Sequence, residues 1–493
     1  MPTPPSRRLA ALAIAGAAVG LAARIVVLRS SLGTIDSDEA VVGLMARHFA
    51  RGDWRAFYWG QAYGGTIEPA LAALVFRVVG SSAAALKAVP MALDATAAVL
   101  TWGVGRRLTS ATAALVAGML VWLWPATYLW WSLKERGFYE AGLCLTLLGA
   151  LCVVRIVTTP DRSCWPEWVG LGLAAGLGWW ETPQVVYILA PAGVWLIWRV
   201  RTAAWRVIAA VPAFVLGAHP WLWPNQQDGF ASLKPPPSPV KGGYFDNLVT
   251  LAHVGAPMTM GYRVPYATRW LHPTPVAQAL FLVTLAVVAA GCLMRWPGGR
   301  LVGLVLLCLP FLHALLPLAG TVAEGRYTLF ALPWLALAIA HRANHPIASA
   351  GAVGLAAGVT VAGLLAMRGQ TQPYAPDRHV PRSLASLERG LDAHGLRHVW
   401  ANYWVAYRLT FETRERTIAA PASSDRFPAY AASVASDPRA GHVFMSGSHT
   451  EAVFHAALDE RHIAYERWTA GADWVVYVPA TAIGPTDIAN NSP

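Results

Sequence analysis

The chain has 493 residues, of which 55% are hydrophobic and only 13% are charged, and its mean hydropathy is +0.42. A soluble globular domain carries about 25% charged residues, so this composition excludes an ordinary soluble protein. The formal net charge of +11 does not indicate nucleic-acid binding, because Lys and Arg flank apolar runs and no zinc-finger, RNA-binding or helix-turn-helix signature is present.

The N-terminal segment contains Arg7-Arg8 followed by an apolar run over residues 9–27. This run reaches the length of about 20 residues that a helix needs to cross a bilayer. Because many apolar runs follow it, we expect an uncleaved signal anchor. The positive-inside rule then places the N-terminus in the cytoplasm.

An acidic stretch follows this first span in an outer loop over about residues 29–82. Asp36 could cap a helix and Glu39 could close a capping box. A cap needs one or two acidic groups, whereas Asp38 makes three beside the end of an apolar span. The density of carboxylates therefore favours a functional site, in which one residue can serve both roles.

The residues after the acidic stretch predict an amphipathic helix that lies on the membrane surface. Apolar and aromatic side chains recur there at helical spacing: Val41, Leu44, Met45, His48 and Phe49. The loop continues with Tyr58 to Pro69, which is rich in aromatic, glycine and amide groups, and this composition suits a sugar. Tyr63 and Glu68 are the candidate substrate-binding residues of this segment, and an ordinary loop with glycine turns is the alternative.

Ten further apolar runs predict membrane-crossing helices, which gives about eleven in all. They cover about residues 83–105, 111–131, 138–157, 167–179, 183–198, 205–221, 276–294, 301–320, 328–341 and 347–367. Alternation makes the turns near residues 106, 160, 202, 297 and 343 cytoplasmic, and these turns are rich in arginine, as the positive-inside rule requires. A second outer loop covers about residues 222–275.

Cationic side chains lie in two short turns on the outer side. Lys134 and Arg136 precede the run at 138–157, and Arg326 with Tyr327 begins the run at 328–341. Charges at a membrane boundary usually extend toward water, but these could bind a phosphate instead. Their position on the same side as the carboxylates favours the second interpretation.

The C-terminal segment, residues 369–493, changes in character. Strand-like runs at residues 398–400, 443–445 and 474–477 alternate with helix-like stretches at 383–394 and 450–461. This pattern predicts a small soluble α/β domain outside the cytoplasm. Residues 1–368 would form the all-α membrane domain.

The sequence offers little evidence of a metal or redox site. The five cysteines lie in or beside apolar runs without metal-ligand spacing, so no disulfide framework is expected. Asp36-x-Asp38 is a weak metal-binding pattern, and a divalent cation near Asp38 and Glu39 is an open expectation. No P-loop, dinucleotide-binding fingerprint or nucleophile elbow is present.

In these motifs, the chain resembles the GT-C class of membrane glycosyltransferases, in the branch of the protein O-mannosyltransferases and aminoarabinose transferases. The resemblance covers about residues 9–345 and depends on the order and sidedness of several short motifs. These are Asp38-Glu39 with the surface helix behind it, Glu68-Pro69, the Arg-Arg-Leu end of the second span, Lys134-Glu-Arg136-Gly, and Arg326-Tyr327 with Pro333.

The resemblance implies inverting transfer of a sugar from a polyprenyl-phosphate donor to a hydroxyl of a cell-envelope glycan, lipid or protein, with the active site outside the cytoplasm. Asp38 would be the general base, and Glu39 would orient it or help to bind an ion. Lys134, Arg136 and Arg326 would hold the donor phosphate. The additional carboxylate of Asp36 leaves a second candidate for the base.

The alternative is a lipid or small-molecule transporter or flippase without glycosyl transfer. Such a protein would place ionisable groups at the middle of the membrane. Asp94, in the second predicted span, is the one candidate for that role, and a buried structural carboxylate explains it equally well.

Overall fold

The computed structural model describes residues 7–159, 164–234, 242–316, 319–343, 346–369, 373–375 and 378–485. Its contacts divide the chain into two compact units. The first unit comprises Met1–Arg29, Ala62–Glu68 and Lys87–Arg368, and the second comprises Ser30–Gln61, Pro69–Leu86 and Gly369–Pro493. Much of the first predicted outer loop thus groups with the C-terminal segment. The functional boundary of a catalytic domain at residue 368 stays a prediction.

Six helices in the described part of the chain are long and apolar enough to cross a membrane. They belong to α1 (Arg7–Leu28), α4 (Ala83–Leu108), α7 (Tyr139–Thr158), α9 (Val186–Val200, with the 3-10 turn before it), α14 (Thr274–Leu293) and α17 (Pro346–Ala366). A seventh is added if α10 (Ala210–Gly217) and α11 (His219–Gln227), which meet at a bend of 56°, form one broken span.

The predicted number of about eleven spans is not confirmed. Several of the predicted runs form shorter helices: α5 (Ala111–Leu123), α8 (Trp165–Glu181), α15 (Gly299–Ala314) and α16 (Leu332–Ala340). The run at 111–131 is interrupted where Pro125, which has no N–H to continue the helical ladder, separates α5 from α6 (Ala126–Trp131).

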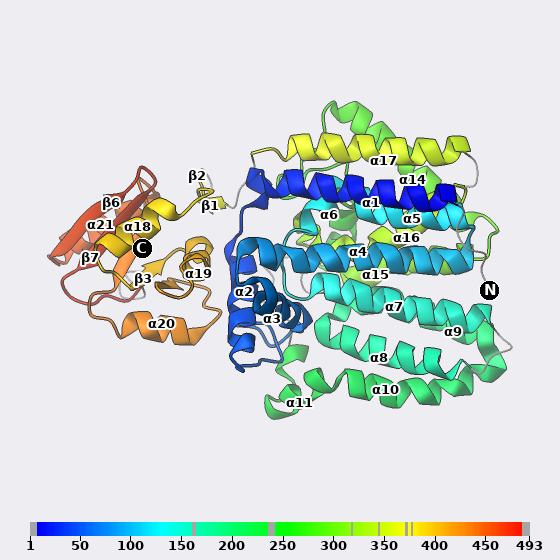
Figure 1. Cartoon of the computed structure of the whole chain (residues 1–493), viewed down its shortest axis with the longest axis horizontal. Coiled ribbons are helices and arrows are strands. Elements are labelled where there is room, and N and C mark those ends of the chain that lie inside the picture. Colours follow the sequence, from blue (N-terminus) through cyan, green and yellow to red (C-terminus); the bar gives the residue numbers. More distant parts are fainter. Residues whose placement is uncertain are drawn as a thin grey trace. The chain divides into compact units, whose positions relative to one another are not determined.

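The helices of the first unit pack as a bundle in which α7 contacts α8, α8 contacts α10, α9 contacts α15, and α5 contacts both α1 and α16 (Figure 1). Small residues allow the closest approaches. A Cβ atom added to Gly172 or Gly176 of α8 would lie 2.2 Å from a backbone oxygen of α10. Close contact through small residues is how helices associate where apolar burial supplies little driving force.

The second unit contains a five-stranded sheet in the order β4-β3-β5-β7-β6. β3 (His398–Ala401) pairs in parallel with β4 (Ile418–Pro421) and β5 (Gly441–Met445), whereas β7 (Trp474–Pro479) is antiparallel to β5 and to β6 (Tyr465–Ala470). The three predicted strands are β3, β5 and β7, so the predicted α/β character of this segment is confirmed.

Helices cover both faces of this sheet. Apolar side chains of α18 (Ala385–Ala393) and α19 (Tyr403–Glu412) form one core with Val399, Val443 and Val476. On the other face, α20 (Pro428–Ala435) packs on Trp400, and α21 (His449–Glu460) packs on Tyr477. Alternation of side chains along each strand explains why neighbouring residues serve opposite cores.

Helix α2 (Ser37–Ala50) is the predicted amphipathic helix, and it packs against α19 within the second unit. Almost all of its residues are buried, so it differs from a helix whose polar face is open to water. Gly43 permits the contact, because a Cβ atom there would lie 2.4 Å from the Phe411 ring. Arg47 completes it by donating to the carbonyl oxygen of Phe411 at 2.9 Å.

Candidate active site

The three acidic residues at the start of α2 have different environments. Asp36 is the N-cap: its Oδ1 accepts from the N–H of Glu39, and Glu39 Oε2 accepts from the N–H of Asp36, both at 3.2 Å. This is the predicted capping box. Asp36 and Glu39 are buried, with exposed fractions of 3% and 0%, whereas Asp38 keeps partial exposure to solvent.

Asp38 contacts two tyrosines of the second unit. Tyr403, the first residue of α19, donates its hydroxyl to Asp38 Oδ1 at 2.5 Å, and Tyr58 donates to the Asp38 carbonyl oxygen at 3.0 Å. The guanidinium of Arg426 lies near both tyrosine rings. Tyr403 and Arg426 were not predicted as site residues, because no local pattern in the sequence indicates which residue of a distant domain contacts Asp38.

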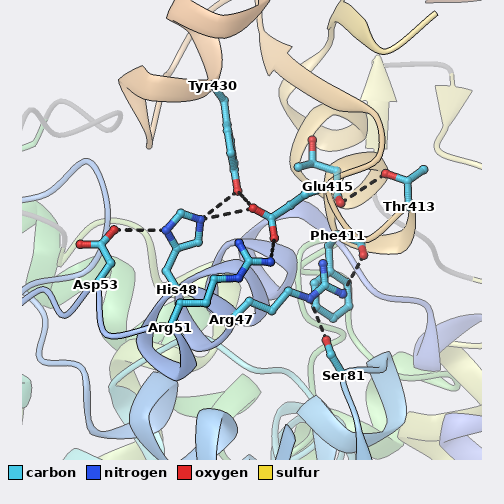
Figure 2. Close-up of polar contacts among 10 residues, drawn as sticks. Arg47, His48, Arg51, Asp53, Ser81, Phe411, Thr413, Glu415 and Tyr430 are labelled. Atoms are coloured by element: carbon cyan, nitrogen blue, oxygen red, sulfur yellow. Dashed lines mark hydrogen bonds and ion pairs between the residues drawn. The ribbon is translucent and has the colours of Figure 1, made fainter. Parts of the chain in front are cut away.

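A second polar cluster lies at the other end of α2, around His48 (Figure 2). Its Nδ1 is 3.2 Å from Asp53 Oδ2 and its Nε2 is 3.3 Å from Glu415 Oε1. Tyr430 donates to the same Glu415 oxygen at 3.0 Å, and Arg51 donates to the other at 3.1 Å. Hydrogen bonding to Glu415 is the main reason that the pKa of His48 is raised, against the opposing effect of burial.

The pKa of Glu415 shifts in the opposite direction to that of His48. Burial alone would raise the pKa of this carboxyl, but the hydrogen bonds from His48 and Tyr430 and the charge of Arg51 outweigh it and lower the pKa to about 2. Both partners are therefore favoured in their charged forms. The cluster joins the C-terminal end of α2 to the segment after α19.

The cationic turn of the first unit lies between α6 and α7. Lys134 and Arg136 are buried, with exposed fractions of 6% and 7%. The Lys134 ammonium is 5.5 Å from the centre of the Trp130 ring, and the Arg136 guanidinium is 5.2 Å from that of Trp131. Aromatic faces attract cations at such distances, so the turn holds two positive charges away from bulk water.

Arg326 lies in the segment that precedes α16. It pairs with Glu324 at 2.6 Å, and its guanidinium is 5.0 Å from the centre of the Tyr327 ring and 5.7 Å from that of Tyr139. Tyr139 is the first residue of α7, which directly follows the turn with Lys134 and Arg136. The first unit thus brings the predicted cationic motifs to neighbouring positions.

A cavity of about 290 Å³ lies in the first unit beside these motifs. Two predicted substrate-binding residues, Tyr63 and Tyr327, line it. Most of the remaining lining is aromatic or apolar, and the other aromatic residues are Phe138, Tyr139, Trp179, Trp180, Tyr187 and Trp221. A cavity with flat apolar walls and few polar groups can accept a sugar ring or a lipid chain.

Glu68 is buried and forms a structural contact. Its Oε1 accepts from the N–H of Ala141 at 2.9 Å, in the first turn of α7. Glu181 similarly accepts from the N–H of Ile67 at 3.0 Å, where α3 (Ile67–Val79) begins. Each glutamate satisfies a helix donor that has no partner within its own helix. Gly65 is needed beside them, because a Cβ atom there would lie 2.2 Å from Glu181 Oε1.

Lys87 is a further buried cation that the sequence reasoning missed. It lies on α4, has an exposed fraction of 2%, and donates from Nζ to the carbonyl oxygen of Leu133 at 3.0 Å. A lysine inside an otherwise apolar run is a signal that could have identified it. Lys87 therefore supports the backbone immediately before Lys134.

The predicted site residues fall into two groups. The predicted catalytic residues Asp38 and Glu39 belong to the second unit, as does Asp36, which is also a substrate-binding candidate. The other substrate-binding candidates belong to the first unit: Tyr63, Glu68, Lys134, Arg136, Arg326 and Tyr327. Within the described ranges, no group of three His, Cys, Asp or Glu residues could hold a metal ion. The divalent cation near Asp38 and Glu39 stays an expectation without a described ligand set.

Comparison with known proteins identifies the fold. No family model and no curated protein sequence matches the chain. The crystal structure of ArnT from Cupriavidus metallidurans bound to undecaprenyl phosphate aligns over 96% of this chain and 98% of that chain, with a TM-score of 0.62 and 13% identity. ArnT in the apo state gives a TM-score of 0.60 at the same identity and coverage.

An oligosaccharyltransferase from Archaeoglobus fulgidus, in a complex with Zn and sulfate, aligns over 94% of this chain and 72% of that chain, with a TM-score of 0.51 and 11% identity. Likeness at such low identity concerns the fold. The chain has the GT-C fold, and the fold expected from the resemblance is confirmed.

Proposed function

We propose that this protein is a membrane glycosyltransferase that moves a sugar from a polyprenyl-phosphate donor to an acceptor hydroxyl outside the cytoplasm, with inversion at the anomeric carbon. The observation that carries the proposal is the likeness in fold, over nearly the whole of both chains, to ArnT bound to undecaprenyl phosphate. A donor anchored in the membrane also meets a physical need, since nucleotide sugars are confined to the cytoplasm.

Lys134, Arg136 and Arg326 are proposed to bind the donor phosphate. Lys134 and Arg136 are buried among aromatic rings, and the partly exposed Arg326 lies against the Tyr327 ring. These surroundings support the role, because a cation in a site with little water attracts an anion more strongly than it does in water. The neighbouring aromatic cavity would receive the sugar or the first isoprene units. Tyr63 and Tyr327 are its proposed contacts.

Asp38 is the proposed general base. Of the three carboxylates at the start of α2 it alone keeps partial exposure, whereas Asp36 and Glu39 are buried in the capping box. A base has to reach the proton that it removes, which favours Asp38 over Asp36. Glu39 would act indirectly, by fixing the helix turn that carries Asp38.

The transporter alternative depended on Asp94 as an ionisable group in the middle of the membrane. Asp94 forms a buried ion pair with Arg24 of α1, and Arg24 also donates to Ser132 and to the Trp122 carbonyl oxygen. A carboxylate held in this way has a structural role in the bundle.

The test is sugar transfer from a radiolabelled polyprenyl-phosphate sugar in proteoliposomes. Asp38→Asn should lower kcat by about 10²–10⁴-fold, the usual contribution of a general base, while Asp459→Asn, at an exposed aspartate of α21, should not change it. Lys134→Ala and Arg136→Ala should mainly raise KM for the donor. Movement of the lipid across the bilayer without transfer, or full activity of Asp38→Asn, would contradict the proposal.

A further inference from the structure

The first residue of α19 contacts the proposed base. Tyr403 Oη and Asp38 Oδ1 are 2.5 Å apart, although the two residues are 365 positions apart in the sequence. Charge-assisted hydrogen bonds from a hydroxyl to a carboxylate have this length. Val405, Ala406 and Leu409 of α19 pack in the core with the sheet, so the sheet anchors the helix whose first residue contacts Asp38.

Tyr403 is itself held in place. Arg426 Nε donates to Tyr403 Oη at 3.4 Å, and its guanidinium carbon is 5.9 Å from the centre of the Tyr403 ring. The backbone at Arg426 is fixed by Tyr407, whose Oη accepts from the N–H of Arg426 at 2.6 Å and from that of Phe427 at 3.1 Å. The chain of contacts therefore runs from Tyr407 of α19 through Arg426 and Tyr403 to the carboxylate of Asp38.

The protonation states agree with this geometry. Burial, followed by the negative charge of Asp38, raises the pKa of Tyr403. Burial would lower the pKa of Arg426, but Tyr58, Tyr403 and Asp38 outweigh it and raise that pKa. Tyr403 is thus a hydroxyl donor at neutral pH, and Arg426 is a cation beside the pair.

We propose that Tyr403 is a positioning residue for Asp38, supplied to the reaction by the C-terminal domain. This inference rests on the proposed function. Tyr403 fixes the rotamer of the carboxylate by holding Oδ1, and Arg426 keeps the tyrosine ring in place. The C-terminal domain is then part of the catalytic machinery.

The step balances without any further reactant. The acceptor hydroxyl gives its proton to the carboxylate of Asp38, and the acceptor oxygen forms a bond to the anomeric carbon of the donor. The bond from that carbon to the phosphate oxygen breaks, and its electron pair leaves with the polyprenyl phosphate. Tyr403 keeps its proton throughout.

Kinetics of Tyr403→Phe in the full-length protein test the inference. Loss of the hydrogen bond should lower kcat by roughly 10–100-fold, as small misplacements of a catalytic group do, with little change in KM for the donor. A hydroxyl that donates to a carboxylate favours the ionised form. The acidic limb of the pH–rate profile should therefore move to higher pH in the variant.

Tyr477→Phe is the matched control. Tyr477 is also a buried tyrosine that donates to a carboxylate, Glu451, at 2.8 Å in the same domain, so a purely structural effect of losing such a hydroxyl would be seen in both variants. Tyr477→Phe should leave the acidic limb of the profile where it is in the parent protein. A purely structural Tyr403 would lower the thermal stability of the protein without moving that limb.

The outcomes separate the two proposals. If Asp38→Asn is inactive and Tyr403→Phe has the kcat and pH profile of the parent protein, the role of Tyr403 is wrong and the proposed function stands. If Asp38→Asn keeps full activity, or if the parent protein transfers no sugar, the proposed function fails and the role of Tyr403 fails with it.

Discussion

Arg24 and Asp94 show how a single pair can be essential to the first unit. The side chains of both are almost completely buried, and Arg24 reaches α5 and the turn after α6 as well as α4. A charge inside a bundle is costly unless it is paired. The pair should therefore tolerate joint replacement much better than the loss of one member.

We predict that Asp94→Asn destabilises the protein by about 3–5 kcal/mol, because it removes the ion-pair partner of the buried Arg24. Thermal unfolding of the detergent-solubilised protein measures the effect. The double variant Arg24→Met, Asp94→Leu should recover much of the loss, and Thr96→Val, at an exposed position of the same helix, should have no effect. Equal melting temperatures for Asp94→Asn and the parent protein would show that the ion pair does not contribute to stability.

Contacts between charged residues and their neighbours in the sequence could be predicted, whereas contacts with distant segments could not. The capping box of Asp36 and Glu39 follows from their spacing of three residues, and the structure confirms it. The partners of Asp94, Glu68 and Glu181 come from segments 70 or more positions away. The spacing of residues within one helix does not indicate which distant segment of the chain will contact it.

At the scale of elements, α2 and α19 depend on one another. Residues along the whole of α2 contact α19 or the turn after it, from Asp38 with Tyr403 to His48 with Glu415. Gly43 and Phe411 meet at the middle of this contact. There is no room for an added methyl group at Gly43, because its Cβ position is 2.4 Å from the Phe411 ring.

Gly43→Ala should therefore separate α19 from α2 and speed hydrogen exchange in both helices, since a Cβ atom would lie well inside contact distance of the Phe411 ring. Adding Phe411→Leu should restore much of the protection by making room. Gly354→Ala, at a glycine of α17 that has nothing near its Cβ position, is the control. Unchanged exchange in Gly43→Ala would contradict the close packing described for this contact.

The His48 cluster makes the same contact sensitive to pH. Hydrogen bonding to Glu415 and Asp53 raises the pKa of His48 above its ordinary value of about 6.5. The stabilisation that these His48 contacts give to the folded state is complete below about pH 6.5. It is lost as the pH rises through the raised pKa of His48. Glu415, whose pKa is lowered to about 2, contributes above its ordinary value of about 4.5 and loses that contribution as the pH falls toward 2.

Hydrogen exchange of α2 and α19, corrected for the intrinsic effect of pH, should thus show protection that weakens as the pH rises above about 6.5. His48→Gln should remove this dependence. The charged and titratable groups that face His48 are Asp53, Glu415 and Tyr430, with Arg51 on the far side of Glu415. If His48→Gln keeps the same pH dependence, another of these groups is the cause of that dependence.

The sequence did not predict α19 as an element, for a physical reason. One of its faces packs on the sheet and another on α2, so the run from Tyr403 to Glu412 shows no clear alternation of polar and apolar residues. Periodicity indicates an element only when one face meets water. Strands β3, β5 and β7 were predictable because each is a short apolar run between polar segments.

At the scale of the whole molecule, the apolar bundle and the small α/β domain were predictable from composition and hydropathy. The number of spans was not, because a run of apolar residues does not reveal where a proline divides it, as Pro125 does. The orientation of the chain in the membrane stays a prediction of the distribution of arginines.

Cysteine labelling tests that orientation. In a variant without the five native cysteines, Thr450→Cys, exposed in the C-terminal domain, should react with an impermeant thiol reagent on intact cells. Arg199→Cys, exposed at the end of α9, should react only after the cells are permeabilised. The reverse pattern would invert the predicted topology and place the proposed active site in the cytoplasm.

The contact between α2 and α19 has a consequence for biosynthesis. Arg47 and Phe411, which meet in this contact, are 364 positions apart. At about 5–20 residues per second, a ribosome needs roughly 20–70 s to make the intervening chain. During that time the apolar surface of α2 that later contacts Phe411 lacks its partner from α19. A ribosome that stalls before α19 would leave this nascent chain exposed to aggregation and proteolysis.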